Sequence, residues 1–519
     1  MGSKRQTVVL FLAALTVVLS SPLINELQPG EEWPQRNSVR QPVADDQTEQ
    51  TLTEDFSTDD PAPAAVVEDA IIVAKTIERD HEPKKIDYSG SQVWQVSTTK
   101  SGARQVIGRL RRRNLISTWG GNQSSVDILI KPNVVENITR VFKRESIDYN
   151  VVIEDLQKRI NEENPPLDND EIELQDRRAR AHNFWRYRAP NQRLGLFSAY
   201  MGYNSLNIPM EYWPNANWGH RMTWKQYHRL EDIYGFMDYL AKTYPSIISV
   251  KSIGKSFEGR DLKILRISNG KSDNKAVFID GGIHAREWIS PATVTYFIYQ
   301  FAEYFDVESD DIKGIDWYFM PVVNPDGYEY THTVDRLWRK NRKPGYRACT
   351  GTDLNRNFGH HWGGKGASNS PCSEIYRGSN AFSEPETLAL SEFIKSSAAN
   401  FSAYVTYHSY GQYMLYPWGY DNAVPPDYKD LDNLGKKMAE AISKTGGSQY
   451  QVGSSSGLLY PAAGGSDDWA KSQGIKYSYT IELSDTGRYG FVLPTSFIVP
   501  VAKENLAGLR VLASQVIKE

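Results

Sequence analysis

The chain has 519 residues, a length that is typical of several domains rather than one. Hydrophobic residues make up 40% of it, which is enough for a packed core in at least part of the chain. A net charge of -4 and an isoelectric point of about 6.2 favour neither nucleic acid nor a membrane surface as a partner.

The first residues predict a signal for secretion. Lys4 and Arg5 precede an apolar run from Val8 to Leu19, and small residues follow. The run is shorter than the roughly 20 residues that span a bilayer, so a cleaved signal peptide over residues 1–21 is favoured over a membrane anchor. We therefore expect a secreted, extracellular protein.

Residues 22–85 differ in composition from the rest of the chain. The stretch "DDQTEQTLTEDFSTDD" is acidic and poor in aromatic residues. Such a composition buries too little apolar surface to fold, so we interpret the segment as a disordered linker. An acidic binding tail is the alternative.

Residues 86–165 predict a small α+β domain. Strand-like alternation and helix-like spacing of apolar residues follow one another, the latter at Val106 and Leu110. Helices on one face of an antiparallel sheet would bury both kinds of apolar surface. Strands are predicted within 91–98 and 124–132, helices within 100–114 and 133–145, and a strand running into a short helix within 148–160.

Residues 166–221 show little hydrophobic periodicity and contain the arginine-rich motif "QDRRARAHNFWRYRAPNQR". An exposed segment of this kind between two domains is a natural site for cleavage by a trypsin-like protease. We expect an activating cut here, and a plain basic linker is the alternative.

From residue 222 to residue 519 the pattern becomes α/β. A helix is predicted from an N-cap at Thr223 to Pro245, and a hairpin is predicted around Glu258 and Gly259. Strands alternating with helices predict a mixed, largely parallel sheet covered by helices. Further strands are predicted within 275–284, 315–327, 400–410 and 475–485, and a helix within 291–305.

Three chemically active residues lie at the C-terminal ends of these strands, where sites form in such sheets: His284, His408 and Glu482. A catalytic zinc needs three protein ligands and one open position, which His284, Glu287 and His408 could supply. A polar loop and a satisfied buried histidine are the alternatives. Glu482 lies in an apolar strand, where an unpaired carboxylate is costly, so a function or a partner is expected for it.

Six motifs then point to one family: "HAREW", "RLWRKNR", "DLNRNF", "YHSYGQ", "LYPAAGGSDDWA" and "YTIELSDTGRYGF". Through their order and spacing, residues 222–519 resemble the secreted zinc metallocarboxypeptidases of the pancreatic carboxypeptidase A/B type, most of all the B-type pro-enzymes. Residues 86–165 resemble the inhibitory propeptide of that family, with less specific motifs. The resemblance implies an α/β zinc carboxypeptidase fold and a zymogen that removes C-terminal residues from peptides.

The resemblance implies one zinc ion (Zn2+) per chain, with His284, Glu287 and His408 as its ligands. It assigns Asp353 to orient the first histidine and Glu482 to act as the general base. It assigns Arg339 to stabilise the oxyanion of the scissile carbonyl. A solvated basic loop is the alternative for Arg339.

The remaining roles concern the substrate. The resemblance assigns Asn355, Arg356 and Tyr460 to the terminal carboxylate, for which the planar fork of an arginine is well suited. It assigns Arg286 and Tyr410 to secondary subsites. A turn-forming role for Asn355 and loop packing for Tyr460 are the alternatives.

The resemblance places Asp467 at the floor of the pocket for the C-terminal side chain. A carboxylate there would pair with a cationic side chain and would be left unpaired by an apolar one, so we expect a preference for Lys and Arg. A preference for apolar residues, with Asp467 capping a helix near Trp469, is the alternative. Ser455 and Ala462 are expected to shape the pocket, and Ser484 departs from the arginine that relatives often carry.

The two cysteines, Cys349 and Cys372, are expected to form one disulfide, because neither stands in a CxxC pair that would suit zinc. Asn122, Asn137 and Asn400 each open a glycosylation sequon. We expect a monomer whose partners are peptides with free C-termini and an activating protease. A catalytically weak binding protein, or an interaction protein acting through the acidic segment, is the alternative.

Overall fold

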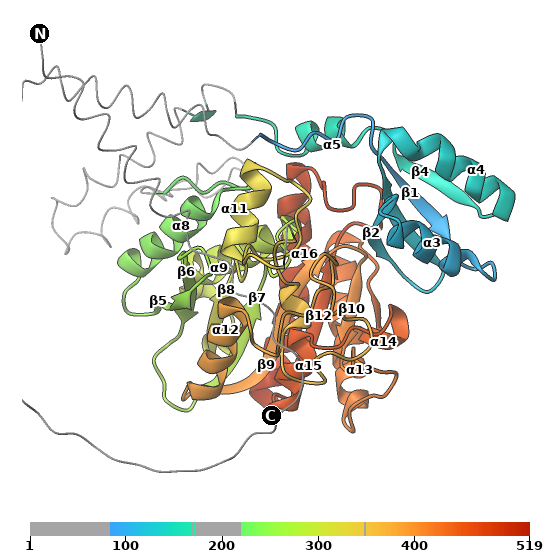
Figure 1. The fold of residues 1–519 in the computed structure, drawn as a ribbon. Helices are drawn as coiled ribbons and strands as arrows, with labels where there is room; N and C mark the ends of the chain where they lie inside the picture. The colour runs from blue at the N-terminus through green and yellow to red at the C-terminus, as the bar shows by residue number, and fades with distance from the viewer. Residues whose placement is uncertain (1–83, 168–170, 173–219, 347–348) are drawn as a thin grey trace, which may run out of the picture. The chain divides into compact units, whose positions relative to one another are not determined.

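The computed structural model describes residues 84–167, 171–172, 220–346 and 349–519, which Figure 1 draws as ribbons. All of them belong to one unit of the chain, His81–Glu519. The expected signal peptide, all but the last two residues of the expected linker, and the whole arginine-rich motif lie outside the described residues.

The first described region is a four-stranded antiparallel sheet. In spatial order its strands are β2 (Ile116–Gly121), β3 (Ser125–Ile130), β1 (Gln92–Ser97) and β4 (Tyr149–Ile153). Helices α3 (Ala103–Arg112) and α4 (Val135–Glu145) pack together on it, burying Trp94, Leu110 and Phe142 in one cluster. The region ends in α5 (Leu156–Glu163), whose N-terminus is capped by the side chain of Asp155. The expected α+β domain is confirmed.

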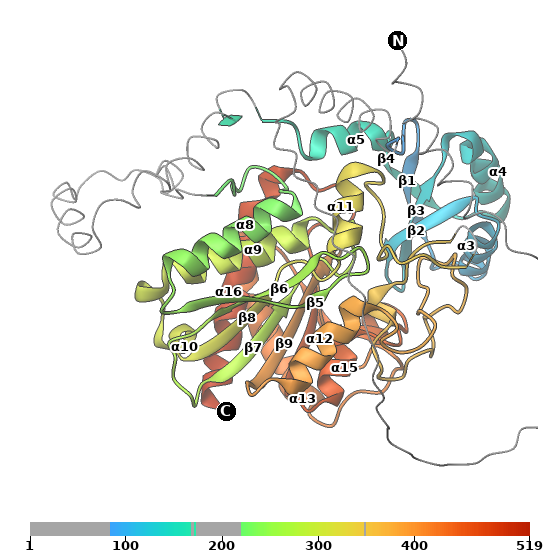
Figure 2. The same cartoon turned by 60° about the vertical axis from the view of Figure 1, so that its left-hand side comes forward.

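The second described region contains an eight-stranded mixed sheet (Figure 2). The four strands in its middle, β12, β9, β7 and β8, pair in parallel, which brings their C-terminal ends to one edge. The expected α/β architecture is confirmed. The spatial order is β11 (Gln451–Ser454), β10 (Tyr413–Tyr416), β12 (Tyr477–Leu483), β9 (Asn400–Ser409), β7 (Lys275–Asp280), β8 (Ile315–Met320), β6 (Asp261–Ile267) and β5 (Ile248–Lys255).

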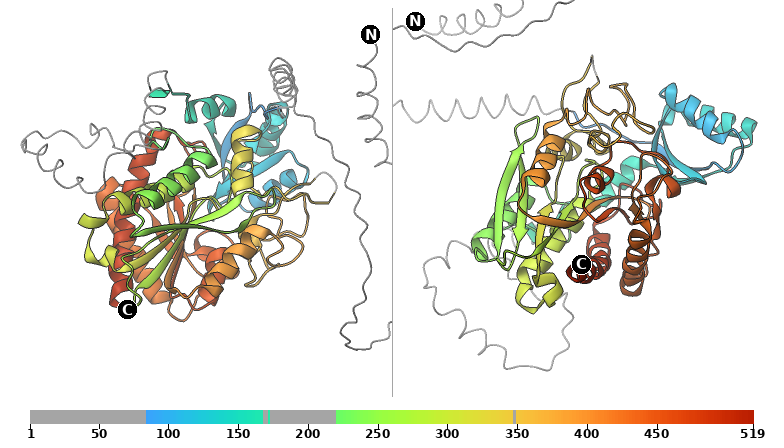
Figure 3. Two further views of the ribbon diagram at one scale, coloured as in Figure 1. Left: turned by 90° about the vertical axis from the view of Figure 1, so that its left-hand side faces the viewer. Right: turned by 90° about the horizontal axis from the view of Figure 1, so that it is seen from below.

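Helices cover both faces of this sheet, as Figures 2 and 3 show, and a buried core lies on each face. Successive side chains of β7 alternate between them, with Val277 and Ile279 in one core and Phe278 in the other. Helices α8 (Leu230–Thr243), α9 (Ile289–Glu303), α13 (Tyr428–Gly446) and α16 (Ile498–Lys518) supply the first core, and α12 (Pro385–Ser396) and α15 (Ser466–Ser472) supply the second.

Short elements make the remaining connections. They are α10 (Asp310–Lys313), α11 (Pro325–Thr333), α14 (Ser455–Leu458) and the 3-10 turns Pro132–Val134, Phe305–Val307, Leu354–Arg356 and Thr495–Phe497. Within the part of the chain that the structure describes, no helix has both the length and the hydrophobicity to cross a membrane.

The prediction that a helix starts at Thr223 is wrong, because α8 begins only at Leu230. The backbone N–H of Thr223 donates to the ring of His228 at 2.9 Å instead. Asn164, next to α5, exchanges two hydrogen bonds with the backbone of Tyr227. These bonds replace the helical ones over residues 224–229.

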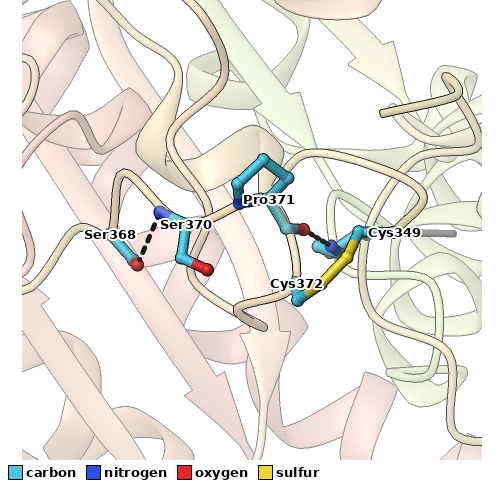
Figure 4. Close-up of a disulfide and its surroundings, with 6 residues drawn as sticks. Cys349, Ser368, Ser370, Pro371 and Cys372 are labelled. Atoms are coloured by element: carbon cyan, nitrogen blue, oxygen red, sulfur yellow. Dashed lines mark hydrogen bonds between the residues drawn. A yellow bond between two sulfur atoms is a disulfide. The ribbon is translucent and has the colours of Figure 1, made fainter. Parts of the chain in front are cut away.

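The disulfide joins Cys349 to Cys372, as expected, with a Cα–Cα distance of 4.9 Å (Figure 4). Beside it, the carbonyl of Pro371 accepts a hydrogen bond from Nζ of Lys340 at 2.9 Å. The closed loop contains the "DLNRNF" motif, so the disulfide limits the freedom of a segment that carries candidate site residues.

Candidate metal centre and active site

The three expected metal ligands come together at the C-terminal edge of the sheet. Strand β7 ends at Asp280, and a two-glycine turn carries the chain to His284 and Glu287. Gly282 in this turn has a φ of +64°, and a Cβ there would lie 3.0 Å from a proline ring, so a glycine is required. His408 belongs to the neighbouring parallel strand β9.

The ligand atoms of the three residues converge. Nδ1 of His284 lies 2.8 Å from Oε1 of Glu287 and 3.1 Å from Nδ1 of His408. Nδ1 of His408 lies 3.1 Å from Oε2 of Glu287, and all three side chains are buried. The ligand atoms lie within 4.8 Å of one another. Two imidazoles and a carboxylate are a donor set of catalytic zinc sites, so the residues fit a zinc ion.

The charges in this cluster also suit a cation. Burial lowers the pKa of His284, and Arg339 lowers it further. Burial also opposes the charged form of His408, but the carboxylate of Glu287 outweighs burial and raises the pKa of His408 to about 9. Burial opposes the ionised form of Glu287, yet the two imidazoles hold the pKa of its carboxyl well below the usual range. The cluster therefore contains an ionised carboxylate.

Asp353 holds both His284 and Arg339. Its Oδ1 accepts a hydrogen bond from Nε2 of His284 at 3.1 Å, which leaves Nδ1 of that ring free for a metal. Its Oδ2 accepts from Nε and Nη2 of Arg339 at 3.1 and 2.9 Å. Burial opposes the ionised form of Asp353, but Arg339 keeps the pKa of its carboxyl well below the usual range. Arg339 is therefore not part of a solvated basic loop.

Glu482 lies on β12, opposite His408 in the parallel register. Burial raises the pKa of Glu482 to about 7, with His408 acting against this shift and Glu287 adding to it. Its side chain is partly exposed, so water can reach a carboxyl that exchanges protons near neutral pH. Ser484, two positions further, donates a hydrogen bond to Gln412 at 3.3 Å.

Two of the three residues expected to hold the substrate carboxylate lie in one turn, Leu354–Arg356, and the third, Tyr460, is exposed. Arg356 donates from Nε to a backbone carbonyl at 3.0 Å and from Nη1 to the carbonyl of Asn355 at 2.7 Å. No hydrogen bond to another described residue involves its Nη2. Oδ1 of Asn355 accepts from the backbone N–H of Ser466 at 2.9 Å, which joins this turn to α15. Tyr460 is 48% exposed, so it is not a packed loop aromatic.

Asp467 is buried in the first turn of α15. The helix begins one residue earlier, with Gly465 as its N-cap and no side-chain cap bond, so Asp467 does not cap a helix starting near Trp469. The hydroxyl of Ser455 donates to Oδ2 of Asp467 at 3.5 Å. Burial raises the pKa of the Asp467 carboxyl, which is therefore a site where a cationic partner would be favourable.

Asp468 has a different task from its neighbour. Its carboxylate accepts hydrogen bonds from the backbone N–H groups of Gly419 and Tyr420, at 2.8 and 2.9 Å, and so fixes the loop after β10. A Cβ at Gly419 would lie 3.5 Å from the carbonyl of Ala462. The two acids thus have different partners: Asp468 holds the loop after β10, whereas Asp467 interacts with the side chains of Ser455 and Thr480.

Arg286 and Tyr410 lie against the N-terminal domain. The guanidinium of Arg286 lies 4.2 Å from the ring centroid of Phe491, and the ring of Tyr410 lies 5.0 Å from the same ring. Trp119 of β2 packs on Phe491 at 5.2 Å, and Oδ2 of Asp127 of β3 accepts a hydrogen bond from the Tyr410 hydroxyl at 2.6 Å. The N-terminal domain therefore contacts Tyr410 directly, and it covers the ring of Phe491 on which Arg286 packs.

Neither Trp119 nor Asp127 is identified from the sequence. Asp127 does carry a signal, since it is a charged residue inside the apolar strand "SVDILI". Trp119 carries none, because Gly120 and Gly121 interrupt the alternation of β2, which is not predicted. A Cβ on Gly120 would lie 3.2 Å from the Tyr410 hydroxyl, so the missing side chain gives Tyr410 its room.

A buried ion pair also joins the two regions, and the sequence gives no sign of it. Glu163, at the end of α5, accepts hydrogen bonds from Nε and Nη2 of Arg336 at 2.7 and 2.5 Å. Arg336 lies 3.7 Å from the ring centroid of Trp288 and donates to the carbonyls of Arg286 and Phe491. Burial raises the pKa of Glu163 to about 7 against the pull of Arg336.

Two family models match the chain. Residues 233–508 match the zinc carboxypeptidase model, and residues 94–163 match the carboxypeptidase activation peptide. Carboxypeptidase B of Astacus astacus is 47% identical over 296 residues, which cover 56% of this chain and 98% of that protein. Carboxypeptidase A1 of Bos taurus is 35% identical over 434 residues, which cover 82% of this chain and 93% of that protein.

Solved structures are similar over both described regions. The crystal structure of thrombin activatable fibrinolysis inhibitor has a TM-score of 0.68 and 32% identity, and the match covers 83% of this chain and 100% of that one. The carboxypeptidase A from Helicoverpa armigera has a TM-score of 0.66 and 29% identity, over 83% of this chain and 98% of that one. Both similarities thus extend beyond the C-terminal region.

Proposed function

The chain belongs to the zinc carboxypeptidase family, as a carboxypeptidase zymogen with an activation peptide, and from this we propose that it is secreted and, once cut, removes C-terminal Lys and Arg from peptides with one zinc ion. The observation that carries the proposal is the convergence of the ligand atoms of His284, Glu287 and His408 beside Glu482. These three residues would hold the metal. A bound zinc would supply a Lewis acid that polarises a carbonyl and lowers the pKa of water.

Glu482 and Arg339 would perform the rest of the chemistry. Glu482 takes a proton from the attacking water and passes it to the leaving amine, roles for which its pKa near 7 is suited. Arg339 is held by Asp353, and its Nη1 lies 3.8 Å from Glu287. Its positive charge therefore lies beside the proposed metal site. There it stabilises negative charge on the carbonyl oxygen as it develops. Arg356, Asn355 and Tyr460 would hold the terminal carboxylate of the substrate.

Asp467 would select the side chain that is removed. A Lys or Arg side chain pairs with the buried carboxylate, whereas a Phe or Leu side chain would leave it unpaired at a cost of several kcal/mol. The buried position of Asp467 and its raised pKa support this choice.

The N-terminal domain would keep the enzyme latent. Its contacts to Tyr410, Phe491 and Arg336 support this role, because substrate could not occupy the same surface. A trypsin-like protease would release the domain by cutting within residues 166–221, and the active form would be a monomer.

The test uses purified full-length protein that is first cut with trypsin. We expect kcat/KM to be higher on peptides ending in Arg or Lys than on matched peptides ending in Phe or Leu. Chelation should abolish the activity and added zinc should restore it. Full activity after exhaustive chelation would refute the metal site, and faster removal of Phe than of Arg would favour the apolar preference instead.

A further inference from the structure

His408 has a hydrogen-bond partner on the side of its ring that faces away from the other metal-ligand candidates. Its Nε2 lies 3.2 Å from the hydroxyl oxygen of Thr406, and that hydroxyl donates to Oδ1 of Asp280 at 2.7 Å. All three side chains are at most 1% exposed. Thr406 and Asp280 are paired in the register of the parallel strands β9 and β7, so the backbone sets this chain of contacts.

The direction of the hydrogen bonds follows from the number of protons available. The hydroxyl of Thr406 has one hydrogen, and it is used on the carboxylate of Asp280. The hydroxyl can then only accept from His408, so Nε2 must carry the ring proton. In the neutral ring that a metal requires, Nδ1 then has the free lone pair, and Nδ1 is the atom that faces His284 and Glu287.

The position of Asp280 needs an explanation of this kind. The carboxyl group has no exposure to solvent, and it interacts with the hydroxyls of Thr406 and Tyr404. Burying a carboxyl group costs free energy unless the group is hydrogen-bonded, and Thr406 supplies such a bond here. Asp353 performs such a task for His284 by direct contact.

We propose that Thr406 and Asp280 are positioning residues for the metal site, holding His408 in its Nε2–H tautomer so that Nδ1 can bind zinc. The proposal rests on the zinc site proposed above. The two histidines are then held differently: His284 directly by a carboxylate, and His408 by a carboxylate acting through a hydroxyl.

The test compares three single variants of the full-length chain by zinc affinity, measured in competition with a chelator. Thr406→Val keeps the shape but removes the hydroxyl, and should weaken zinc binding about 10- to 100-fold. Thr406→Ser restores the hydroxyl and should bind zinc within about threefold of the wild type. Thr293→Val is the matched control, since this buried hydroxyl makes no hydrogen bond to another described residue, and should leave zinc affinity unchanged.

Thermal unfolding of the metal-free proteins shows whether each variant folds. If Thr406→Val does not fold, Thr406→Ser and Thr406→Ala give the same comparison, because they differ by one oxygen atom. Equal zinc affinity with and without the hydroxyl would overturn the proposal, and so would failure of Thr406→Ser to restore binding in a folded protein. A wild-type chain that binds no zinc would instead refute the proposed metal site itself.

Discussion

Glu482 is the residue on which the proposed chemistry depends most directly. Glutamine has nearly the same shape but cannot accept a proton, so Glu482→Gln should lower kcat about 10²- to 10⁴-fold. Zinc content and KM should stay close to those of the wild type, because Glu482 is not one of the three ligand candidates. Steady-state kinetics and metal analysis of the cut enzyme measure this. Glu440→Gln, an exposed residue on α13, is the control, and a kcat within twofold of wild type in Glu482→Gln would contradict the role.

The pH dependence of the activity should report the same carboxyl. Glu482 must be ionised to act as a base, so activity should rise as the pH rises through its pKa. Burial raises that pKa to about 7, and a bound cation nearby would lower it again. We therefore expect kcat/KM to fall as the pH is lowered through a value at or below about 7. The measurement uses a peptide with an uncharged C-terminal side chain, whose charge stays constant over this pH range. Activity that does not fall toward about pH 5 would contradict this assignment.

Asp467 and Asp468 allow a paired test of specificity. Asp467→Asn removes the charge from the proposed pocket, so the ratio of kcat/KM for Arg over Phe should fall by about 10²-fold or more. Asp468→Asn makes the same change one residue further on, where the carboxylate holds the loop at Gly419, and should leave the ratio nearly unchanged. The ratio is measured for both variants on matched peptides that end in Arg or Phe, and zinc analysis shows whether each variant keeps its metal. A ratio that falls equally in the two variants would point to loss of the loop rather than of the pocket.

Residues could be predicted from the sequence where chemistry and local pattern coincide. His284 and Glu287 stand in one short motif of metal-ligand types, and Asp353 is assigned only through the family resemblance; the structure brings the three together. Glu163 and Arg336 are 173 positions apart, and although Arg336 opens the motif "RLWRKNR", nothing local indicates that the two residues pair. The pairing of Glu163 with Arg336 is set by the packing of α5 against the second region. The periodicity of the sequence does not indicate that packing.

At the scale of elements, apolar strands were the most predictable. The four inner residues of β7, 276–279, are all apolar and buried, which is typical of a covered parallel strand. Helix α8 starts later than its periodicity predicts, because a local hydrogen bond from Thr223 to His228 and a tertiary one from Tyr227 to Asn164 override helix propensity. Strand β2 is hidden by its glycines, which lower strand propensity but make room for Tyr410.

Helix α5 offers a test of how the N-terminal domain is held. The burial that raises the pKa of Glu163 offsets much of its attraction to Arg336, yet removing one partner leaves the other charge buried and unpaired. Glu163→Gln should therefore weaken the contact by about 3–5 kcal/mol. The uncut protein should become more active, measured on a peptide substrate before any proteolysis.

Glu162→Gln is the matched control for this variant. Glu162 is the preceding residue, is exposed, and forms an ion pair with Arg159 on the same helix. Its replacement should leave the activity of the uncut protein unchanged. Equal basal activity in wild type and Glu163→Gln, with both proteins folded, would show that the ion pair does not hold the domain in place.

At the scale of the whole molecule, latency is the property to measure. The full-length protein should be weakly active, and limited tryptic cleavage between residues 166 and 221 should raise its activity at least about tenfold. A tenfold change corresponds to a free-energy difference of about 1.4 kcal/mol between the blocked and the open form. Activity before and after cleavage, on one peptide and with the cut mapped by mass spectrometry, tests this. Equal activity in both forms would rule out an inhibitory role for the first region.

The contacts of Asp127 with Tyr410 and of Glu163 with Arg336 do not depend on the intervening chain being intact. While the chain is whole, these contacts are intramolecular, so they do not weaken when the protein is diluted. After the cut, the same contacts join two separate molecules and obey mass action. Cleavage would then leave much of the enzyme still blocked in a concentrated solution, and dilution would release it. A freed domain could also bind other copies of the enzyme. The domains released first would then inhibit the enzyme molecules that are cut later.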